Sequence, residues 1–230
     1  MNEILEALFA RKSMRAYTGE AVPAETKELI LRAACAAPTA GNQQLYTILD
    51  ITDQAVKDKL AVSCDNQPFI AEAEVVLIFC ADCQKWYDAF VCAGCEPRLP
   101  RAGDLMLAVA DCAIAAQNAV TAADSLGFGS CYIGDIMEQC ETHRELLNLP
   151  EYVFPAVMLV IGAPTRQQLE RPKPRRSTKT PTAAWTGRSC GKCLPPRLGS
   201  VPMRTGSAPF ANGNINPTFP GKCPGLWRSI

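Results

Sequence analysis

The stretch GDLMLAVADCAIAAQNAVTAADS, residues 103–125, decides the fold, because it is long, unbroken and rich in small apolar side chains. Its length and composition predict a helix that is buried in the middle of the protein. Asp111, Gln117 and Asn118 lie inside the apolar run, which makes it too polar to span a bilayer. We therefore expect a core helix and no membrane partner.

Shorter segments on both sides of this helix alternate between helical and strand patterns. The sequence predicts strands at 46–51, 74–80, 130–133 and 152–162. It predicts helices at 2–10, from Pro23 to before Pro38, at 54–62 and at 138–147, with an excursion or lid at 83–102. This pattern indicates an α+β fold, in which a central mixed sheet is sandwiched by helices.

Charge divides the 230 residues into two parts. Residues 1–170 carry 12 Lys or Arg and 23 Asp or Glu, whereas residues 171–230 carry 11 Lys or Arg and no acid. The second part also holds 10 of the 18 prolines. Such a composition buries little apolar surface. We predict a folded domain over 1–175 and an aberrant, disordered tail over 176–230.

Two basic segments and one small-polar loop stand out as candidate binding elements. They are RKSMRAY (11–17), APTAGNQQ (37–44) and PKPR (172–175). Arg side chains make planar, bidentate contacts with phosphate, and small residues let a loop approach a flat ring closely. Taken singly, the segments also fit a solvated basic linker and an ordinary helix-to-strand connection.

The glycine-rich segment GFGSCYIGD, residues 127–135, places a short strand between turns. Its backbone amides could hydrogen-bond the edge of a planar ligand, although a plain glycine-rich turn is the common alternative. No GxGxxG motif follows a strand here, so no Rossmann site is implied.

In this order along the chain, these motifs resemble the FMN-dependent nitroreductase family, closest to its NADPH-dependent nitroreductase and flavin-reductase branch. The resemblance covers residues 1–175. It implies an intertwined homodimer with the long helix at the dimer core and FMN at the subunit interface. It also implies hydride transfer from NADPH or NADH through FMN to a nitroaromatic, quinone or flavin acceptor. Because the flavin carries this chemistry, we assign no catalytic side chain.

The resemblance further assigns FMN-binding roles to particular residues. It places phosphate and ribityl contacts at the two basic segments, a partner-subunit flavin contact at the loop, and ring contacts at a glutamine and the backbone after the short strand. The phosphate and ribityl contacts are Arg11, Lys12, Ser13, Arg15, Lys173 and Arg175. The contacts from the partner's loop are Pro38, Thr39, Ala40 and Asn42, and the ring contacts are Gln67 and the backbone of Ile133 and Gly134. Asp135 departs from the small residue that many relatives carry, which alters the local charge. Without the resemblance, Gln67 would be interpreted as a surface residue.

Twelve cysteines, without a secretory signal, favour reduced thiols in a cytoplasmic protein. Three Cys-x-x-Cys pairs, Cys80/Cys83, Cys92/Cys95 and Cys190/Cys193, leave open a cysteine-rich metal-binding or redox-interaction protein. We assign no metal ligand, because only eight residues separate the first two pairs. His143, the only histidine, is predicted to lie at the surface, and nucleic acid is not expected as a partner.

The tail also has an alternative reading. With suitable synonymous codons, a shifted frame of residues 201–229 encodes RPYEDWISAFCKRKYKSDFSREMSRSMEE. That sequence has one proline, residues of both charge signs and many helix-forming residues, and it resembles the usual C-terminal segment of the family. We favour a frameshift beginning near Arg176. A frameshifted chain would be a C-terminally damaged family member with a weakened dimer and little activity. We keep this as a further alternative.

Overall fold

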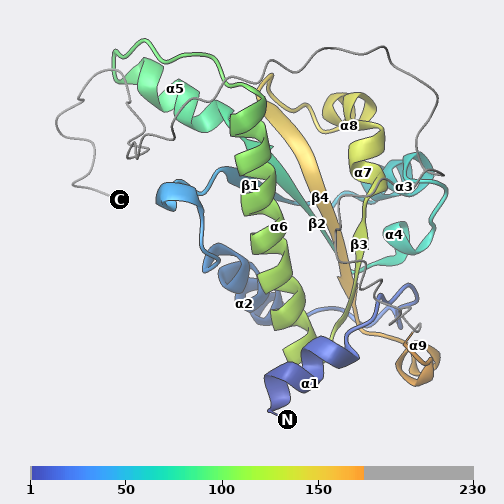
Figure 1. The fold of residues 1–230 in the computed structure, drawn as a ribbon. Coiled ribbons are helices and arrows are strands. Elements are labelled where there is room, and N and C mark those ends of the chain that lie inside the picture. The colour runs from blue at the N-terminus through green and yellow to red at the C-terminus, as the bar shows by residue number, and fades with distance from the viewer. Residues whose placement is uncertain (1, 174–230) are drawn as a thin grey trace, which may run out of the picture. The chain divides into compact units, whose positions relative to one another are not determined.

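The computed structural model describes residues 2–173, which form an α+β fold. One four-stranded sheet carries helices on both of its faces (Figure 1). In spatial order its strands are β1 Tyr46–Asp50, β2 Val75–Asp82, β4 Val153–Gly162 and β3 Gly129–Ile133. The four predicted strands are confirmed.

All three pairings between the described strands are antiparallel, so this sheet lacks the mixed character that we predicted. The run Val75–Phe79 is apolar at every position, which is typical of a strand covered on both faces. Coverage of this kind is frequent in parallel sheets, but it carries no information about direction. The tertiary connections set the direction here.

β2 is the centre of the core, and every one of its residues is buried. Side chains of a strand alternate between its two faces. Leu77 and Phe79 accordingly pack in one apolar cluster, while Val76 and Ile78 pack in the other. One strand therefore joins both helical layers.

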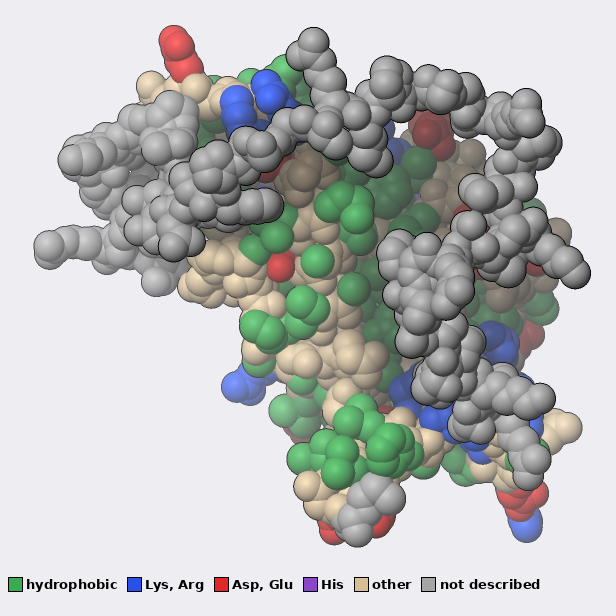
Figure 2. Space-filling model, viewed as in Figure 1, with side chains coloured by type: hydrophobic (Ala, Val, Ile, Leu, Met, Phe, Trp, Pro, Cys, Tyr) green, Lys and Arg blue, Asp and Glu red, His purple; other side chains and the backbone are tan. Residues whose placement is uncertain are grey.

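The first layer consists of α6 Ala102–Ser125 and α2 Ala24–Cys35, which pack on each other, while α6 also packs on the sheet. One face of α6 is buried, and its residues are Ala108, Asp111, Cys112, Ala115, Ala116, Ala119, Val120 and Ala123. The opposite face is exposed and carries Met106, Leu107 and Ile114, where hydrophobic side chains line the helix (Figure 2). The long helix is thus buried along one face only.

In length and apolar composition α6 alone, among the described helices, would qualify to cross a membrane. Its buried face packs against β2 and β4, however. This packing identifies it as the core helix that the sequence predicted.

The second layer covers the other face of the sheet. It consists of α3 Gln54–Ser63, α4 Phe69–Glu72, α7 Asp135–Glu138 and α8 Cys140–Leu146. Asp53 caps α3, because its side chain accepts a hydrogen bond from the Ala55 N–H at 2.8 Å. The helix predicted at 138–147 is confirmed as α8, and the short helix α7 precedes it.

The remaining elements lie towards the two ends of α6 (Figure 1). α1 Glu3–Ala10 and α9 Arg166–Glu170 lie near its C-terminal end, and α5 Gln84–Cys92 forms part of the predicted excursion near its N-terminal end. A short 3₁₀ turn, η1 Ala40–Asn42, precedes β1.

His143 is fully buried, which corrects the prediction that it lies at the surface. Its Nδ1 lies 2.9 Å from the Ile136 carbonyl oxygen, and its Nε2 lies 2.8 Å from Ser63 Oγ. A carbonyl only accepts, so Nδ1 carries the proton and donates to Ile136, while Nε2 shares a hydrogen bond with the Ser63 hydroxyl. These partners come from two other segments, and the sequence around His143 does not reveal them.

We expect His143→Phe to lower the free energy of unfolding by about 2 kcal/mol, because the buried Ile136 carbonyl loses its donor. Ser63→Ala keeps that bond and should cost less. Urea unfolding of both variants measures the difference. Equal stability of His143→Phe and wild type would contradict this role for the histidine.

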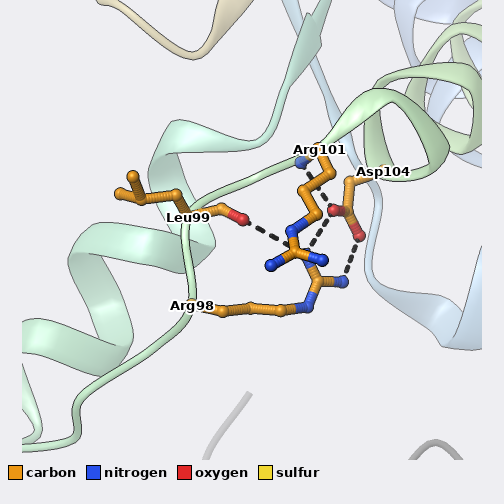
Figure 3. A network of polar contacts seen from close by, with 4 residues as sticks. All are labelled: Arg98, Leu99, Arg101 and Asp104. Carbon is orange, nitrogen blue, oxygen red and sulfur yellow. Dashed lines mark hydrogen bonds and ion pairs between the residues drawn. The ribbon is translucent and has the colours of Figure 1, made fainter.

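A network of polar contacts fixes the start of α6 (Figure 3). The Arg98 guanidinium donates to both carboxylate oxygens of Asp104, at 2.6 and 2.8 Å. The Arg101 N–H donates to the same carboxylate at 2.8 Å. The Arg98 hydrogen bonds hold the pKa of Asp104 below its usual range. The ionised side chain therefore stabilises the folded state.

We expect Asp104→Asn to lower the free energy of unfolding at pH 7 by about 0.5–1 kcal/mol, a modest effect because both partners are partly exposed. Because the folded-state pKa is depressed, the contribution is present above about pH 4, where a free carboxyl ionises, and is lost as the pH falls further. Urea unfolding at pH 7 and pH 3 measures it. Glu170→Gln, at the more exposed Arg166 pair, is the control and should change little at either pH.

Candidate functional site

The two basic segments predicted from the sequence lie side by side. Lys12 Nζ donates to the Leu169 carbonyl oxygen at 2.6 Å and also to the Arg171 carbonyl. Arg171 Nη2 donates in return to the Ser13 carbonyl oxygen at 2.7 Å. The chain after α9 therefore packs along the segment that follows α1.

Two further contacts join the same segments. The Arg15 N–H donates to Gln168 Oε1 at 3.3 Å, and Lys173 Nζ donates to the Phe9 carbonyl. Arg171, which the sequence analysis did not select, belongs to this cluster. Its position directly before the second basic segment in the sequence could have identified it. Arg175 lies outside the described residues.

This basic cluster consists of Arg11, Lys12, Arg15, Arg171 and Lys173, and Asp124 is an acid whose charge acts on Arg11. The ion pairs between described residues lie elsewhere, and the partners of the two lysines are neutral carbonyls. Arg11 Nη1 is buried and has no hydrogen-bond partner among the described residues. A buried donor without a partner is costly. The cluster therefore fits an anion such as a phosphate group.

β3 holds the first basic segment in place. The Met14 N–H donates to the Ser130 carbonyl oxygen at 2.9 Å. The side chain of Met14 packs against Gly129, where an added Cβ would lie 2.6 Å from Met14 Cγ and 2.8 Å from Met14 Cβ. Glycine at 129 is what allows this close approach.

We expect Gly129→Ala to lower the free energy of unfolding by about 1–3 kcal/mol, because Met14 and the segment around it must move. Gly103→Ala is a matched control, since no atom lies within 4 Å of a Cβ at that position in α6. The control should be neutral or slightly stabilising. Urea unfolding compares the two, and equal effects would contradict the role given to the Met14 contact.

A second group of predicted residues lies at the other end of β3. Gln67 Nε2 donates to the Cys64 carbonyl oxygen at 2.8 Å and to Asp135 Oδ2 at 3.0 Å. Ile133 is buried, whereas Gly134 is exposed and has open space where a Cβ would be. A flat ligand can therefore approach the Gly134 backbone. The Asp135 carboxylate lies beside this place and is held by Gln67.

The predicted loop at 37–44 lies elsewhere. It precedes β1, which forms the opposite edge of the sheet from β3, and it lies on the other side of α6 (Figure 1). Within one chain, the structure does not bring Pro38, Thr39 and Asn42 to the basic cluster or to Gln67. The candidate residues therefore form three groups, which are the basic cluster, the group around Gln67 and Gly134, and loop 37–44.

Two surface hollows also lie away from the candidate residues. One of about 300 Å³ is lined by residues that include Cys83, Arg101 and Tyr152, and one of about 450 Å³ by residues that include Val62 and Ser63. Neither contains a predicted FMN contact.

Comparison with known proteins identifies a family. The model of the nitroreductase family matches residues 8–163. The chain is 36% identical to an oxygen-insensitive NADPH nitroreductase of Salmonella typhimurium, over 71% of this chain and 67% of that protein. It is 31% identical to an FMN reductase (NADPH) of Bacillus subtilis, over 75% of this chain and 70% of that protein.

Solved structures give the same result. The protein NfrA2 of B. megaterium superposes with a TM-score of 0.71 at 35% identity, over 76% of this chain and 71% of that chain. The NADPH:FMN oxidoreductase of Vibrio harveyi, solved with NAD⁺, superposes with a TM-score of 0.70 at 28% identity, over 76% and 73%.

Proposed function

The chain is an oxidoreductase of the nitroreductase family, and we propose that it passes hydride equivalents from NADPH or NADH through FMN to a small-molecule acceptor. A nitroaromatic, a quinone or a free flavin is the acceptor class. The observation that carries the proposal is the basic cluster with the buried, unpartnered Arg11 Nη1. Two similar proteins are named for FMN reduction or for the NADPH:FMN reaction.

The cluster would hold the phosphate end of FMN. Arg11, Lys12 and Arg15 supply positive charge from one segment, Lys173 supplies it from the other, and Ser13 adds a hydroxyl. Arg175, outside the described residues, would extend the clamp. Charge-assisted hydrogen bonds of this kind are the stronger ones in proteins.

The second group would address the flavin ring. The exposed Gly134 backbone lets a ring approach, Ile133 anchors that backbone in the core, and Gln67 lies beside it. FMN supplies the hydride chemistry when bound, and the protein's part is to bind, orient and tune it. The side chains named here therefore position the ring, and none acts as an acid or base.

Loop 37–44 would complete the site from a second copy of the chain. The exposed face of α6 is apolar, and α1 adds Ile4, Leu5 and Phe9, all exposed (Figure 2). Exposed apolar surface of this extent favours association. We infer a homodimer, located in the cytoplasm, in which the loop of one copy meets the flavin of the other.

A metal-binding or redox-interaction protein is less well supported. Among the described residues no group of three or more His, Cys, Asp or Glu side chains is arranged to hold a metal. Burial raises the pKa of Cys80 to about 12, which opposes the thiolate that zinc needs. Cys190 and Cys193 lie outside the described residues, as does the tail on which a frameshifted, poorly active member would depend.

Reconstitution tests the three candidates on one preparation. We expect the purified chain to take up about one FMN per subunit and then to oxidise NADPH when an acceptor is added. Absorbance spectra, metal analysis and NADPH oxidation are measured together. Protein that stays colourless after reconstitution, or that holds zinc at protected thiols instead, would contradict the flavin proposal. Bound FMN without turnover would indicate the damaged member.

A further inference from the structure

Loop 39–44 has a backbone conformation that needs support from outside the loop. Its φ angles are 58° at Gly41, 55° at Asn42 and 50° at Gln44. Side chains other than glycine rarely adopt this left-handed region, and such residues persist only where the surroundings hold them. Something beyond the loop must therefore fix it.

Asp111 supplies the first support. This α6 side chain is 2% exposed, and its two oxygens accept from both ends of the loop. Oδ1 lies 3.0 Å from the Ala40 nitrogen, and Oδ2 lies 3.3 Å from the Leu45 nitrogen. An ionised carboxylate is acceptor-only at both oxygens, which suits two converging N–H donors. The one acid on the buried face of the core helix is thus used to hold the loop.

Trp86 of α5 supplies the second support. Its Nε1–H donates to the Gln43 carbonyl oxygen at 2.8 Å, between the two positions that Asp111 holds. The indole ring also packs near Phe90, with ring centroids 6.1 Å apart. The excursion that contains α5 is therefore tied to the same loop as the core helix.

The loop presents one polar side chain, that of Asn42, on its outer side. Asn42 is exposed, and its carboxamide makes no hydrogen bond with the described residues. Inside the loop, Thr39 Oγ1 accepts from the Gln44 N–H at 3.3 Å. A strained and firmly held loop that presents an unpaired carboxamide has the form of a preorganised ligand contact.

We propose that Asp111 and Trp86 are positioning residues, which hold loop 39–44 in the geometry that contacts FMN bound to a second copy of the chain. The inference rests on the proposed function and deepens it. Neither residue touches the flavin. They act by keeping the loop in one conformation before the ligand arrives, and they tie the position of α5 to that of the loop.

The test is the affinity of the full-length protein for FMN, followed by quenching of flavin fluorescence. Asp111→Asn places an NH₂ group against a backbone N–H, and we expect about tenfold weaker FMN binding, which corresponds to 1.4 kcal/mol. Trp86→Phe keeps an aromatic ring but removes the Gln43 bond, and should weaken binding severalfold. Because both residues act on one loop, the FMN affinity of the double variant should fall by less than the product of the two single fold-changes.

Asn118→Ala is the matched control. Asn118 also lies on α6, and its Nδ2 donates to the Ala33 carbonyl oxygen of α2 at 3.1 Å, away from the loop. This variant should lower the unfolding midpoint of the apoprotein while FMN affinity stays unchanged. Circular dichroism and sedimentation confirm that each variant is folded and associates as the wild type does.

Each outcome decides between the proposals. Wild-type FMN affinity in Asp111→Asn, or an equal loss in Asn118→Ala, would overturn the positioning role while leaving the proposed function in place. Wild-type protein that binds no FMN would overturn both. If Asp111→Asn does not fold, Trp86→Phe decides alone, and wild-type affinity in that variant would sink the inference.

Discussion

The burial of β2 on both faces is the constraint on which the rest of the structure depends. Its alternate side chains enter two apolar clusters, one under the α2–α6 layer and one under the layer of α3, α4, α7 and α8. β4, which pairs with β2, adds residues to both clusters. Because β4 pairs with β2 along its length, and β3 with β4, the position of β3 also follows from this strand.

β3 in turn locates both halves of the candidate site. Its first residues bind the segment around Met14, and the turn after its end brings Gly134 and Asp135 to Gln67. The basic cluster is then assembled from two segments that are more than 150 positions apart in the chain. Positive charge gathered in this way, with neutral carbonyls as the partners of its two lysines, is a state that an anion stabilises.

Under the proposed function, the position of loop 37–44 would leave the site of one chain incomplete. Asp111 fixes the loop to α6 on the side away from β3, and the exposed face of α6 is apolar. These facts agree with a site shared between two copies. They also give a reason for an acid in an otherwise apolar helix face, which would be costly if its oxygens were unpaired.

The sequence by itself determined the positions of the strands, the long core helix, the α+β class and the two basic segments, because these depend on local periodicity and charge. It did not determine strand direction, since a run such as Val75–Phe79 is apolar whichever way its neighbours point. Only the tertiary structure decided that His143 is buried against Ser63 and Ile136, that Arg171 joins the basic cluster, and that Asp111 holds the loop. Each of these depends on a hydrogen-bond partner far away in the chain, and no local pattern encodes such a partner.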